Sequence, residues 1–217
     1  CVAYDNMERF FPKEKMVFTG NPIREDILGF YDKITAGKRL FSADENKPTV
    51  LVVGGSLGAK TINNAIADKI DMFKQQQVNL IWQTGVSFQE SAQEYIQSVN
   101  IKGINAFTFI KEMDLAYAAS DVIISRAGAI AISELCCVGK SVILVPSPNV
   151  SENHQYKNAQ SLVNKNAALL VEDAKANRKL VNTLKDLIEN KDLKDSLSSN
   201  IKKIAVTDAA DRIAKIA

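Results

Sequence analysis

The fold is decided by Thr49-Val50-Leu51-Val52-Val53-Gly54-Gly55-Ser56, a β-prone run that ends in two glycines and a serine. The run is continuously apolar, without the alternation of apolar and polar residues. This pattern is typical of a parallel strand in a sheet that has helices on both faces. Val142-Ile143-Leu144-Val145 has the same character. Both stretches therefore predict buried strands of an α/β protein.

Further β-prone runs alternate with helical patterns along the rest of the chain. Together they predict strands at residues 49–53, 78–83, 104–110, 121–125, 141–145 and 167–171. Strands separated by helices form a parallel sheet, and such sheets bind ligands at the carboxyl ends of their strands. We predict an α/β fold with a doubly wound, Rossmann-like sheet of about six strands. The tail from about residue 174 onward predicts helices.

Composition and charge fit a soluble globular protein. The 217 residues are 46% hydrophobic, and the formal net charge of +2 requires no nucleic-acid partner. No apolar run reaches the roughly 18 residues of a membrane-spanning helix, so any membrane contact is expected to be peripheral. The adjacent Cys136 and Cys137 lie in an apolar stretch, without the spacing of metal ligands or of a disulfide framework. We expect a reducing cytosol and no metal site.

The beginning of the chain differs in character from the rest. Cys1-Val2-Ala3-Tyr4 looks like the end of a strand already in progress, which predicts that the sequence is a piece of a longer protein. Lys15-Met16-Val17-Phe18-Thr19 is a short β-prone run, and Gly20-Asn21-Pro22 has the composition of a turn or linker. A domain boundary is therefore predicted near Pro22.

A glycine-rich turn, Gly54-Gly55-Ser56-Leu57-Gly58-Ala59-Lys60, follows the first predicted strand and opens a helix expected to run to about Ile70. Glycines let a backbone approach a ligand closely, and the amides at a helix start favour phosphate, so this turn is a candidate anion site. It has neither the glycine before Lys60 that a P-loop requires nor the glycine spacing of the dinucleotide fingerprint. A purely structural tight turn is an equally good interpretation of the motif alone.

A second candidate follows the predicted strand at 121–125. Arg126-Ala127-Gly128 opens a helix that is apolar almost all round, so Glu134 is expected in apolar surroundings, where it needs a partner. A carboxylate within two turns of a helix start can accept hydrogen bonds from both ribose hydroxyls, while the amides at the start meet phosphates. The alternative is a structural ion pair of Glu134 with Arg126 or Lys140.

A polar loop after the predicted strand at 141–145 leads into a helix that carries His154, Gln155 and Asn158. Gln155 and Asn158 share one helical face, and their amides suit sugar hydroxyls because each amide offers a donor and an acceptor. His154 is the sole histidine of the sequence, and a loop-exposed or capping position explains it at least as well as catalysis.

The fourth candidate is Phe109-Ile110-Lys111-Glu112-Met113, where a strand is expected to end and a helix to begin. Free backbone groups at such a turn can read the edge of a planar base. Packing of Phe109 and Met113 in the core is the simpler interpretation, because large apolar residues usually pack.

In this order and spacing, the four segments resemble the carboxyl-terminal, donor-binding half of MurG-type glycosyltransferases, which have the two-domain GT-B architecture. The resemblance covers nearly the whole chain. It implies an inverting hexosyltransferase that moves N-acetylglucosamine from UDP-N-acetylglucosamine to a lipid-linked muramyl-pentapeptide acceptor, converting lipid I to lipid II in peptidoglycan synthesis. It implies no cofactor, and a location in the bacterial cytoplasm, peripheral on the cytoplasmic face of the membrane.

The resemblance also implies how the chain is divided. Residues 1–22 would be the end of an amino-terminal domain and the linker, and residues 23–206 the domain that binds the UDP-sugar donor. Residues 207–217 would form a helix that packs on the amino-terminal domain. The catalytic base and the membrane-binding surface are expected in that other domain, so this chain alone is expected to bind donor without turnover.

Donor-binding residues are implied residue by residue. Substrate contacts are implied for Arg24, Ser56, Ile110, Met113, Ala129, Ile130, Ala131, Ile132, Ser133, Glu134 and Gln155, with further contacts from Asn21, Gly54, Gly55, Arg126, Gly128 and Asn158. Within this set, Ile110 reads uracil through its backbone, Glu134 binds the ribose, and Gln155 binds the sugar hydroxyls. Leu57 and Ala131 depart from the family pattern, because polar residues can occur at both positions.

Two other functions remain open. Another GT-B enzyme that uses a UDP-sugar, such as an epimerase or a glycolipid transferase, would differ in its selectivity among sugar analogues. A nonenzymatic nucleotide-binding module would bind the nucleotide whatever sugar it carries.

Overall fold

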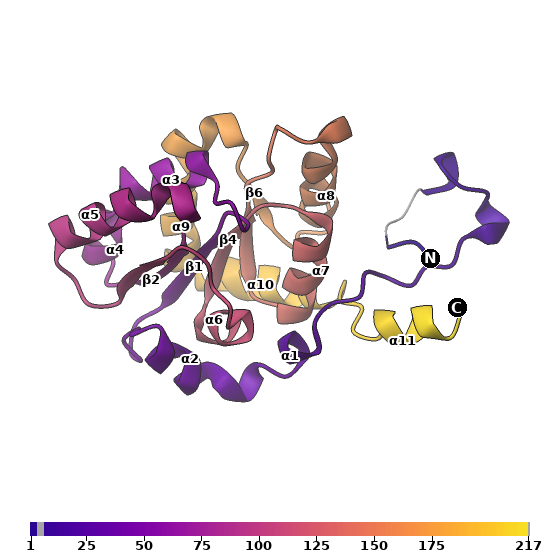
Figure 1. The fold of residues 1–217 in the computed structure, drawn as a ribbon, viewed down its shortest axis with the longest axis horizontal. Coiled ribbons are helices and arrows are strands. Elements are labelled where there is room, and N and C mark those ends of the chain that lie inside the picture. The colour runs from indigo at the N-terminus through magenta and orange to yellow at the C-terminus, as the bar shows by residue number, and fades with distance from the viewer. Residues whose placement is uncertain (4–6, 217) are drawn as a thin grey trace.

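The computed structural model describes residues 1–3 and 7–216, and these form a six-stranded sheet flanked by helices. The strands are β1 (Thr49–Val53), β2 (Asn79–Gln83), β3 (Ile104–Phe107), β4 (Val122–Ser125), β5 (Ser141–Leu144) and β6 (Leu169–Leu170). They lie in the order β3-β2-β1-β4-β5-β6, and every neighbouring pair is parallel (Figure 1). The predicted doubly wound parallel sheet is confirmed.

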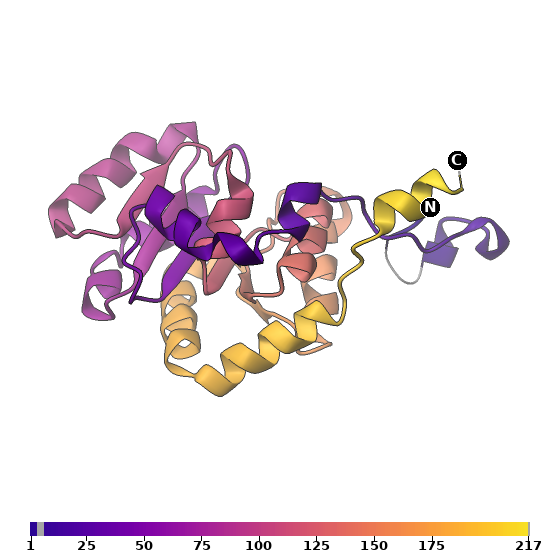
Figure 2. The same ribbon diagram turned by 90° about the horizontal axis from the view of Figure 1, so that it is seen from below.

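Helices connect the strands and cover both faces of the sheet (Figures 1 and 2). They are α1 (Glu25–Leu28), α2 (Ile34–Leu40), α3 (Lys60–Ala67), α4 (Asp71–Gln75), α5 (Gln89–Val99), α6 (Met113–Ala119), α7 (Ala129–Val138), α8 (His154–Val163), α9 (Ala176–Glu189), α10 (Lys191–Lys202) and α11 (Ala209–Ala214). Short 3-10 turns lie at Met7–Arg9, Lys13–Lys15, Tyr31–Lys33, Val86–Phe88, Ser151–Asn153 and Asp173–Lys175.

The strands are apolar throughout because each face of the sheet supports its own core. Val50 and Val52 of β1 point into a core shared with α3, α4, α5 and α9, whereas Leu51 points into a second core shared with α1, α6, α7, α8 and Phe41 after α2. Helix α10 contributes Leu197 to the first core and Ile201 to the second. Burial on both faces explains the continuous apolar runs of the sequence.

Several predicted boundaries differ from the structure. Strand β3 ends at Phe107, and further along the chain the amide of Ile110 donates to the side chain of Gln83. The helix expected to run to Ile70 ends at Ala67 and is followed by the separate helix α4. The β-prone run at residues 15–19 contributes an isolated parallel bridge between Val2 and Phe18.

The two ends of the chain lie together, beyond α7 at one end of the molecule (Figures 1 and 2). The N-terminal segment reaches the sheet through the residues around Pro22, and α11 follows α10 back to the same side. The predictions that involve Tyr4 and Ala217 fall outside the described residues. Within the described residues, no helix is long and apolar enough to span a membrane.

Candidate functional site

The strand order predicts a ligand site between β1 and β4, at what is called here the crevice. From β1 the chain moves outward to β2 and β3, and from β4 it moves outward in the other direction, so connections leave these two neighbours in opposite senses. Open α/β sheets bind ligands at such a switch point, outside the carboxyl ends of the strands. The glycine-rich turn after β1 and Arg126-Ala127-Gly128 after β4 flank this point (Figure 1).

The turn after β1 is fixed by close backbone packing. Gly55 and Gly58 have φ values of +93° and +77°, a region that favours glycine. A Cβ on Gly58 would lie 2.0 Å from the carbonyl oxygen of Thr84, and a Cβ on Gly54 would lie 2.6 Å from the amide nitrogen of Ala59. Close packing therefore requires glycine at positions 54 and 58, as the tight-turn interpretation predicts.

The tip of the same turn is open. Ser56 is exposed, and Leu57 is 86% exposed. A fixed turn with an exposed tip at the carboxyl edge of the sheet can also present its backbone to a ligand. The two interpretations of the motif are therefore compatible in this structure.

Helix α7 starts at the crevice with an open N-terminus. Its N-cap is Gly128, which provides no side-chain cap, and a Cβ built there would meet nothing within 4 Å. Ile130 in the first turn is 49% exposed, whereas the residues from Leu135 to Val138 are buried. The prediction of a helix buried all round is thus wrong at the start of α7. There the positive end of the helix dipole lies at an exposed surface.

Asn21, which precedes α1 in the chain, is tied to this first turn. The Asn21 side-chain nitrogen lies 3.0 Å from Ser133 Oγ and 3.5 Å from the carbonyl oxygen of Ala129. Ser133 Oγ also donates to the Ala129 carbonyl over 3.1 Å. The fold therefore brings together three residues with implied contacts to the UDP-sugar donor: Asn21, Ala129 and Ser133.

Glu134 lies one turn further along α7 and is half-buried. The Tyr117 hydroxyl donates to its Oε2 over 3.1 Å. Burial raises the pKa of Glu134, whereas the hydrogen bond from Tyr117 and the positive charge of Arg24 lower it. Burial and the Glu134 charge raise the pKa of Tyr117 so far that its hydroxyl remains a donor. The predicted need for a partner is met by Tyr117.

The alternative ion pair of Glu134 with Arg126 or Lys140 is wrong. Arg126 donates to the carbonyl oxygen of Val145 and forms a short charged contact with Asp173, which in turn accepts a hydrogen bond from Thr61. These contacts join β4, β5, α3 and the turn before α9. Arg126 therefore serves as an internal strut in this structure, with 16% of its side chain exposed.

Replacing Asp173 with alanine is expected to lower the free energy of unfolding by about 1–2 kcal/mol, because Arg126 then keeps its charge in a mostly buried position without this partner. Urea denaturation followed by circular dichroism measures the change. The neighbouring Glu172→Ala, which removes a half-exposed carboxylate from a pair with Lys175, is the control and should change stability by under about 0.5 kcal/mol. Equal effects of both variants would contradict the strut.

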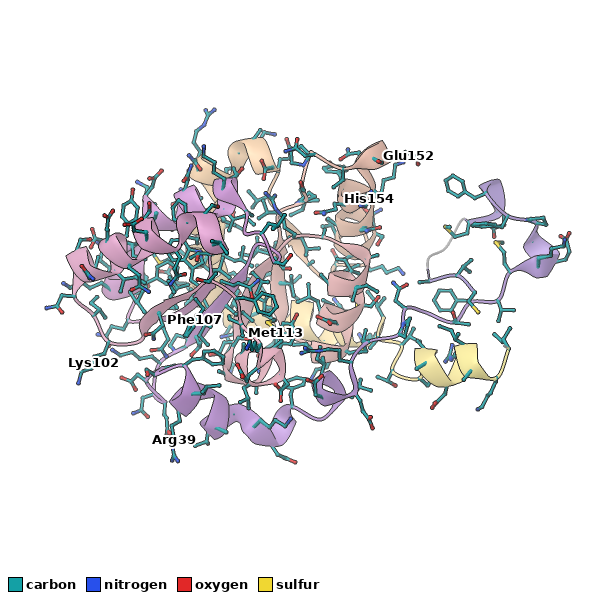
Figure 3. All side chains as sticks on the ribbon, viewed as in Figure 1. Arg39, Lys102, Phe107, Met113, Glu152 and His154 are labelled. Atoms are coloured by element: carbon teal, nitrogen blue, oxygen red, sulfur yellow. The ribbon has the colours of Figure 1, made fainter. Side chains whose placement is uncertain are left out.

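Helix α8 is tied to the same turn by two amides. Gln155 Oε1 accepts from the backbone amides of Ala127 and Ser147 at 3.2 and 2.9 Å, and Asn158 donates to the carbonyl oxygen of Ala127 over 3.1 Å. His154 is exposed, as the loop-exposed interpretation predicts, and its ring lies 2.9 Å from the Ser151 carbonyl oxygen. Figure 3 shows His154 beside Glu152, well apart from Met113 in this view.

The segment after β3 approaches the glycine-rich turn through one side chain. Gln83, at the end of β2, donates to the carbonyl oxygen of Gly55 over 3.0 Å and accepts from the amide of Ile110 over 2.9 Å. Ile110 is buried, and Met113 packs partly against the second core. Phe109 is 55% exposed, so its interpretation as a core residue is wrong.

Three residues of this site were not among the predicted contacts: Gln83, Tyr117 and Asp173. The position of Gln83 at the carboxyl end of a predicted strand was a usable signal, because ligands bind at that edge. Tyr117 is 17 residues from its partner Glu134 in the sequence, and Asp173 is 47 residues from its partner Arg126. No local sequence pattern predicts either contact.

A hollow lies between the N-terminal segment and the helices α7 and α8. Its apolar wall includes Phe10, Phe18 and Leu162. Its lining also includes residues with implied contacts to the UDP-sugar donor, namely Asn21, Ala129, Ile132, Ser133 and Asn158. The hollow and the candidate site therefore share residues of the first turn of α7.

The family model for the glycosyltransferase family 28 C-terminal domain matches residues 49–213. The chain belongs to this family. The match spans β1 to α11 and so includes the crevice and the segments around it.

Close relatives carry one name. The UDP-N-acetylglucosamine--N-acetylmuramyl-(pentapeptide) pyrophosphoryl-undecaprenol N-acetylglucosamine transferase of Phocaeicola vulgatus is 47% identical over 216 residues, which are 99% of this chain and 57% of the relative. The protein of the same name from Flavobacterium psychrophilum is 44% identical over 98% of this chain and 57% of the relative. The resemblance to MurG-type transferases is confirmed, and the chain spans little more than half the length of these relatives.

Solved structures agree with this family 28 fold. The crystal structure of Acinetobacter baumannii MurG matches 90% of this chain and 56% of that chain, with a TM-score of 0.71 and 25% sequence identity. A UDP-GlcNAc 2-epimerase from Neisseria meningitidis, bound to UDP-GlcNAc, matches 96% of this chain with a TM-score of 0.65 and 16% identity. At that identity the epimerase shares the fold alone, and the C-terminal half of the GT-B architecture is confirmed.

Proposed function

We propose that this family 28 domain binds UDP-N-acetylglucosamine as the donor half of an N-acetylglucosaminyltransferase. The observation that carries the proposal is the convergence of four segments on the β1/β4 switch point, with Glu134 below the open start of α7. The names of the relatives at 44–47% identity support the same donor and a lipid-linked muramyl-pentapeptide acceptor.

The diphosphate would lie between the start of α7 and the glycine-rich turn. Backbone amides from Ala129 to Ile132 carry the positive end of the helix dipole, and Gly54-Gly55-Ser56 faces them across the switch point. Gly128 leaves the approach to these amides open, because it has no side chain. Arg24 is half exposed, pairs with Asp26, and adds positive charge near Glu134.

The nucleoside would lie on the opposite side of the first turn of α7. Glu134 Oε2 is held by Tyr117, so the carboxylate has a defined orientation in which to accept hydrogen bonds from the ribose hydroxyls. The turn at Phe109-Ile110 would read the uracil edge through its backbone, with Met113 beside it. Exposed Phe109 provides an apolar surface for a base at this point.

The N-acetylglucosamine would be bound from α8. The Oε1 atom of Gln155 already accepts from two backbone amides. Its NH₂ group would therefore donate the hydrogen bond to a sugar hydroxyl. Asn158 supports the same turn through Ala127. This arrangement accounts for the placement of both amides on one face of α8.

The reaction of the whole protein would be a direct displacement with inversion. The 4-hydroxyl of the muramyl sugar attacks the anomeric carbon, its proton passes to a base in the remainder of the protein, and the bond to UDP breaks. Negative charge then builds on the departing diphosphate, where the α7 amides would stabilise it electrostatically. Because the acceptor is a membrane lipid, the whole protein would work peripherally at the cytoplasmic face of the bacterial membrane.

An epimerase or glycolipid transferase would use the same nucleotide site, and an epimerase of this fold binds UDP-GlcNAc. The high identity to the N-acetylglucosamine transferases favours the transfer reaction. A nonenzymatic nucleotide-binding module would use the same nucleotide site, but its affinity would not depend on the sugar.

Metal-free calorimetric titration of the 217-residue chain tests the proposal. We expect UDP-N-acetylglucosamine to bind more tightly than UDP-N-acetylgalactosamine, because the two sugars differ in the orientation of the hydroxyl at C4, which Gln155 would contact. Gln155→Glu keeps the acceptor for Ala127 and Ser147 but loses the amide donor, so it should reduce the preference about fivefold to tenfold without unfolding the chain. Absence of binding to either compound would contradict the donor site, and equal binding to both would favour the nonenzymatic module.

A further inference from the structure

Gln83 is the one described side chain whose amide bonds both the glycine-rich turn and the turn at Phe109-Ile110. It ends β2, between Val53 of β1 and Phe107 of β3 in the sheet register. Alternation along the strand places it on the same face as Ile81, and only 3% of the residue is exposed. Its bond with Ile110 is buried, and its bond with the exposed Gly55 is partly buried.

The two bonded segments have different tasks in the proposed donor site. Gly55 belongs to the turn that would face the diphosphate, whereas Ile110 belongs to the turn that would read the base. The Gln83 donor is used on the first and its acceptor on the second, at 3.0 and 2.9 Å. One rigid amide plane thus sets the spacing between the two turns.

We propose that Gln83 is a positioning residue that fixes the base-reading peptide relative to the phosphate turn and thereby sets the selectivity for uracil. This inference rests on the proposed function. Its physical basis is the trans peptide between Phe109 and Ile110: when Gln83 holds the Ile110 N–H, the Phe109 carbonyl must point the opposite way. The direction of a backbone acceptor is then determined before any base arrives.

A fixed acceptor discriminates between pyrimidines. Uracil presents an N–H donor at N3, whereas cytosine presents an acceptor there, so CDP would leave the two acceptors facing one another. A freely turning peptide could rotate to present its N–H and would accept both bases more equally. The ratio of UDP to CDP affinity therefore reports on Gln83 more directly than UDP affinity alone.

The first test is calorimetric titration of the full chain and its Gln83→Leu variant with UDP and with CDP, which match in size and charge. We expect the variant to bind UDP about tenfold more weakly and to lose most of the preference over CDP. Unchanged UDP affinity and an unchanged ratio would overturn the inference. Equal losses for UDP and CDP would overturn it as well, because they indicate general weakening of the site.

The Gln83→Glu variant provides a second test that does not depend on how Gln83→Leu folds. A protonated carboxyl group can donate to Gly55 and accept from Ile110, as the amide does, whereas an ionised carboxylate cannot donate. Burial favours the protonated form. Both forms accept from Ile110, so this variant should keep the preference for UDP over CDP at each pH from about 5.5 to 8.5. Its UDP affinity should match that of the unchanged chain at low pH and fall below it as pH rises and the bond to Gly55 is lost.

The outcomes separate the two proposals. If the unchanged chain binds UDP but Gln83→Glu loses the preference for UDP over CDP at every pH, although it still accepts from Ile110, the positioning role fails and the donor site stands. If the unchanged chain does not bind UDP, the proposed function fails and the inference fails with it.

Discussion

Replacing Glu134 with alanine is expected to weaken UDP binding about 100-fold. The proposed ribose contact consists of hydrogen bonds to a charged, half-buried acceptor, and each such bond contributes about 1.5–3 kcal/mol. The variant also removes the partner of Tyr117 Oη, which adds a small cost to the bound state. Isothermal titration with UDP measures the loss, and 100-fold corresponds to about 2.7 kcal/mol.

Glu189→Ala is the matched control for this variant. It removes an exposed carboxylate from the end of α9, where it lies 3.9 Å from Lys185, and should leave UDP affinity unchanged. Equal affinity of the Glu134→Ala variant and the unchanged chain would remove Glu134 from the site. Tyr117→Phe should give an intermediate loss, because it retains the carboxylate but not its fixed orientation.

The pH dependence of the Glu134 contact has a defined sign. Burial raises the pKa of this carboxyl group, so it takes up a proton at higher pH than in the unfolded chain. The carboxylate form that accepts from ribose is lost as pH falls through the raised pKa, and UDP affinity should fall with it. The contribution of Glu134 to stability runs the other way: it is present below the unfolded pKa and is lost as pH rises through the folded pKa.

Replacing Gly58 with alanine is expected to lower the free energy of unfolding by about 3 kcal/mol. The residue has φ of +77°, which costs an alanine about 1–2 kcal/mol, and the new Cβ would lie 2.0 Å from the Thr84 carbonyl oxygen. That carbonyl also accepts from Asn63, whose Oδ1 accepts from the buried Trp82 indole, so a shift of Thr84 disturbs a buried network. Thermal denaturation should show a fall of about 6–12 °C.

Gly29→Ala is the control for the Gly58 variant. Gly29 has φ of −109°, and a Cβ there would meet nothing within 4 Å, so its replacement should change stability by under about 0.5 kcal/mol. A Gly58→Ala variant as stable as the Gly29→Ala variant would show that the turn after β1 relaxes without cost. It would also show that close packing against Thr84 does not fix the turn.

Patterns within short stretches predicted the sheet and the position of its ligand edge. A parallel strand that is buried on both faces needs a continuous apolar run. Such runs can be read directly in the sequence at residues 49–53 and 141–145. A helix start after a strand is likewise a local event, so Gly128 and Glu134 could be placed relative to each other. The bond from the Ile110 amide to Gln83 could not be predicted in this way, because Gln83 belongs to another strand.

The sequence by itself therefore determined the fold class, the family, and the four segments that meet at the switch point. Only the tertiary structure decided the partners: Tyr117 for Glu134, Asp173 for Arg126, and Gln83 between two turns. The physical reason is that secondary structure follows from the periodicity of neighbouring residues, whereas a side-chain hydrogen bond depends on where distant backbone segments pack. A buried polar group must find a partner, but the sequence leaves many residues equally able to serve.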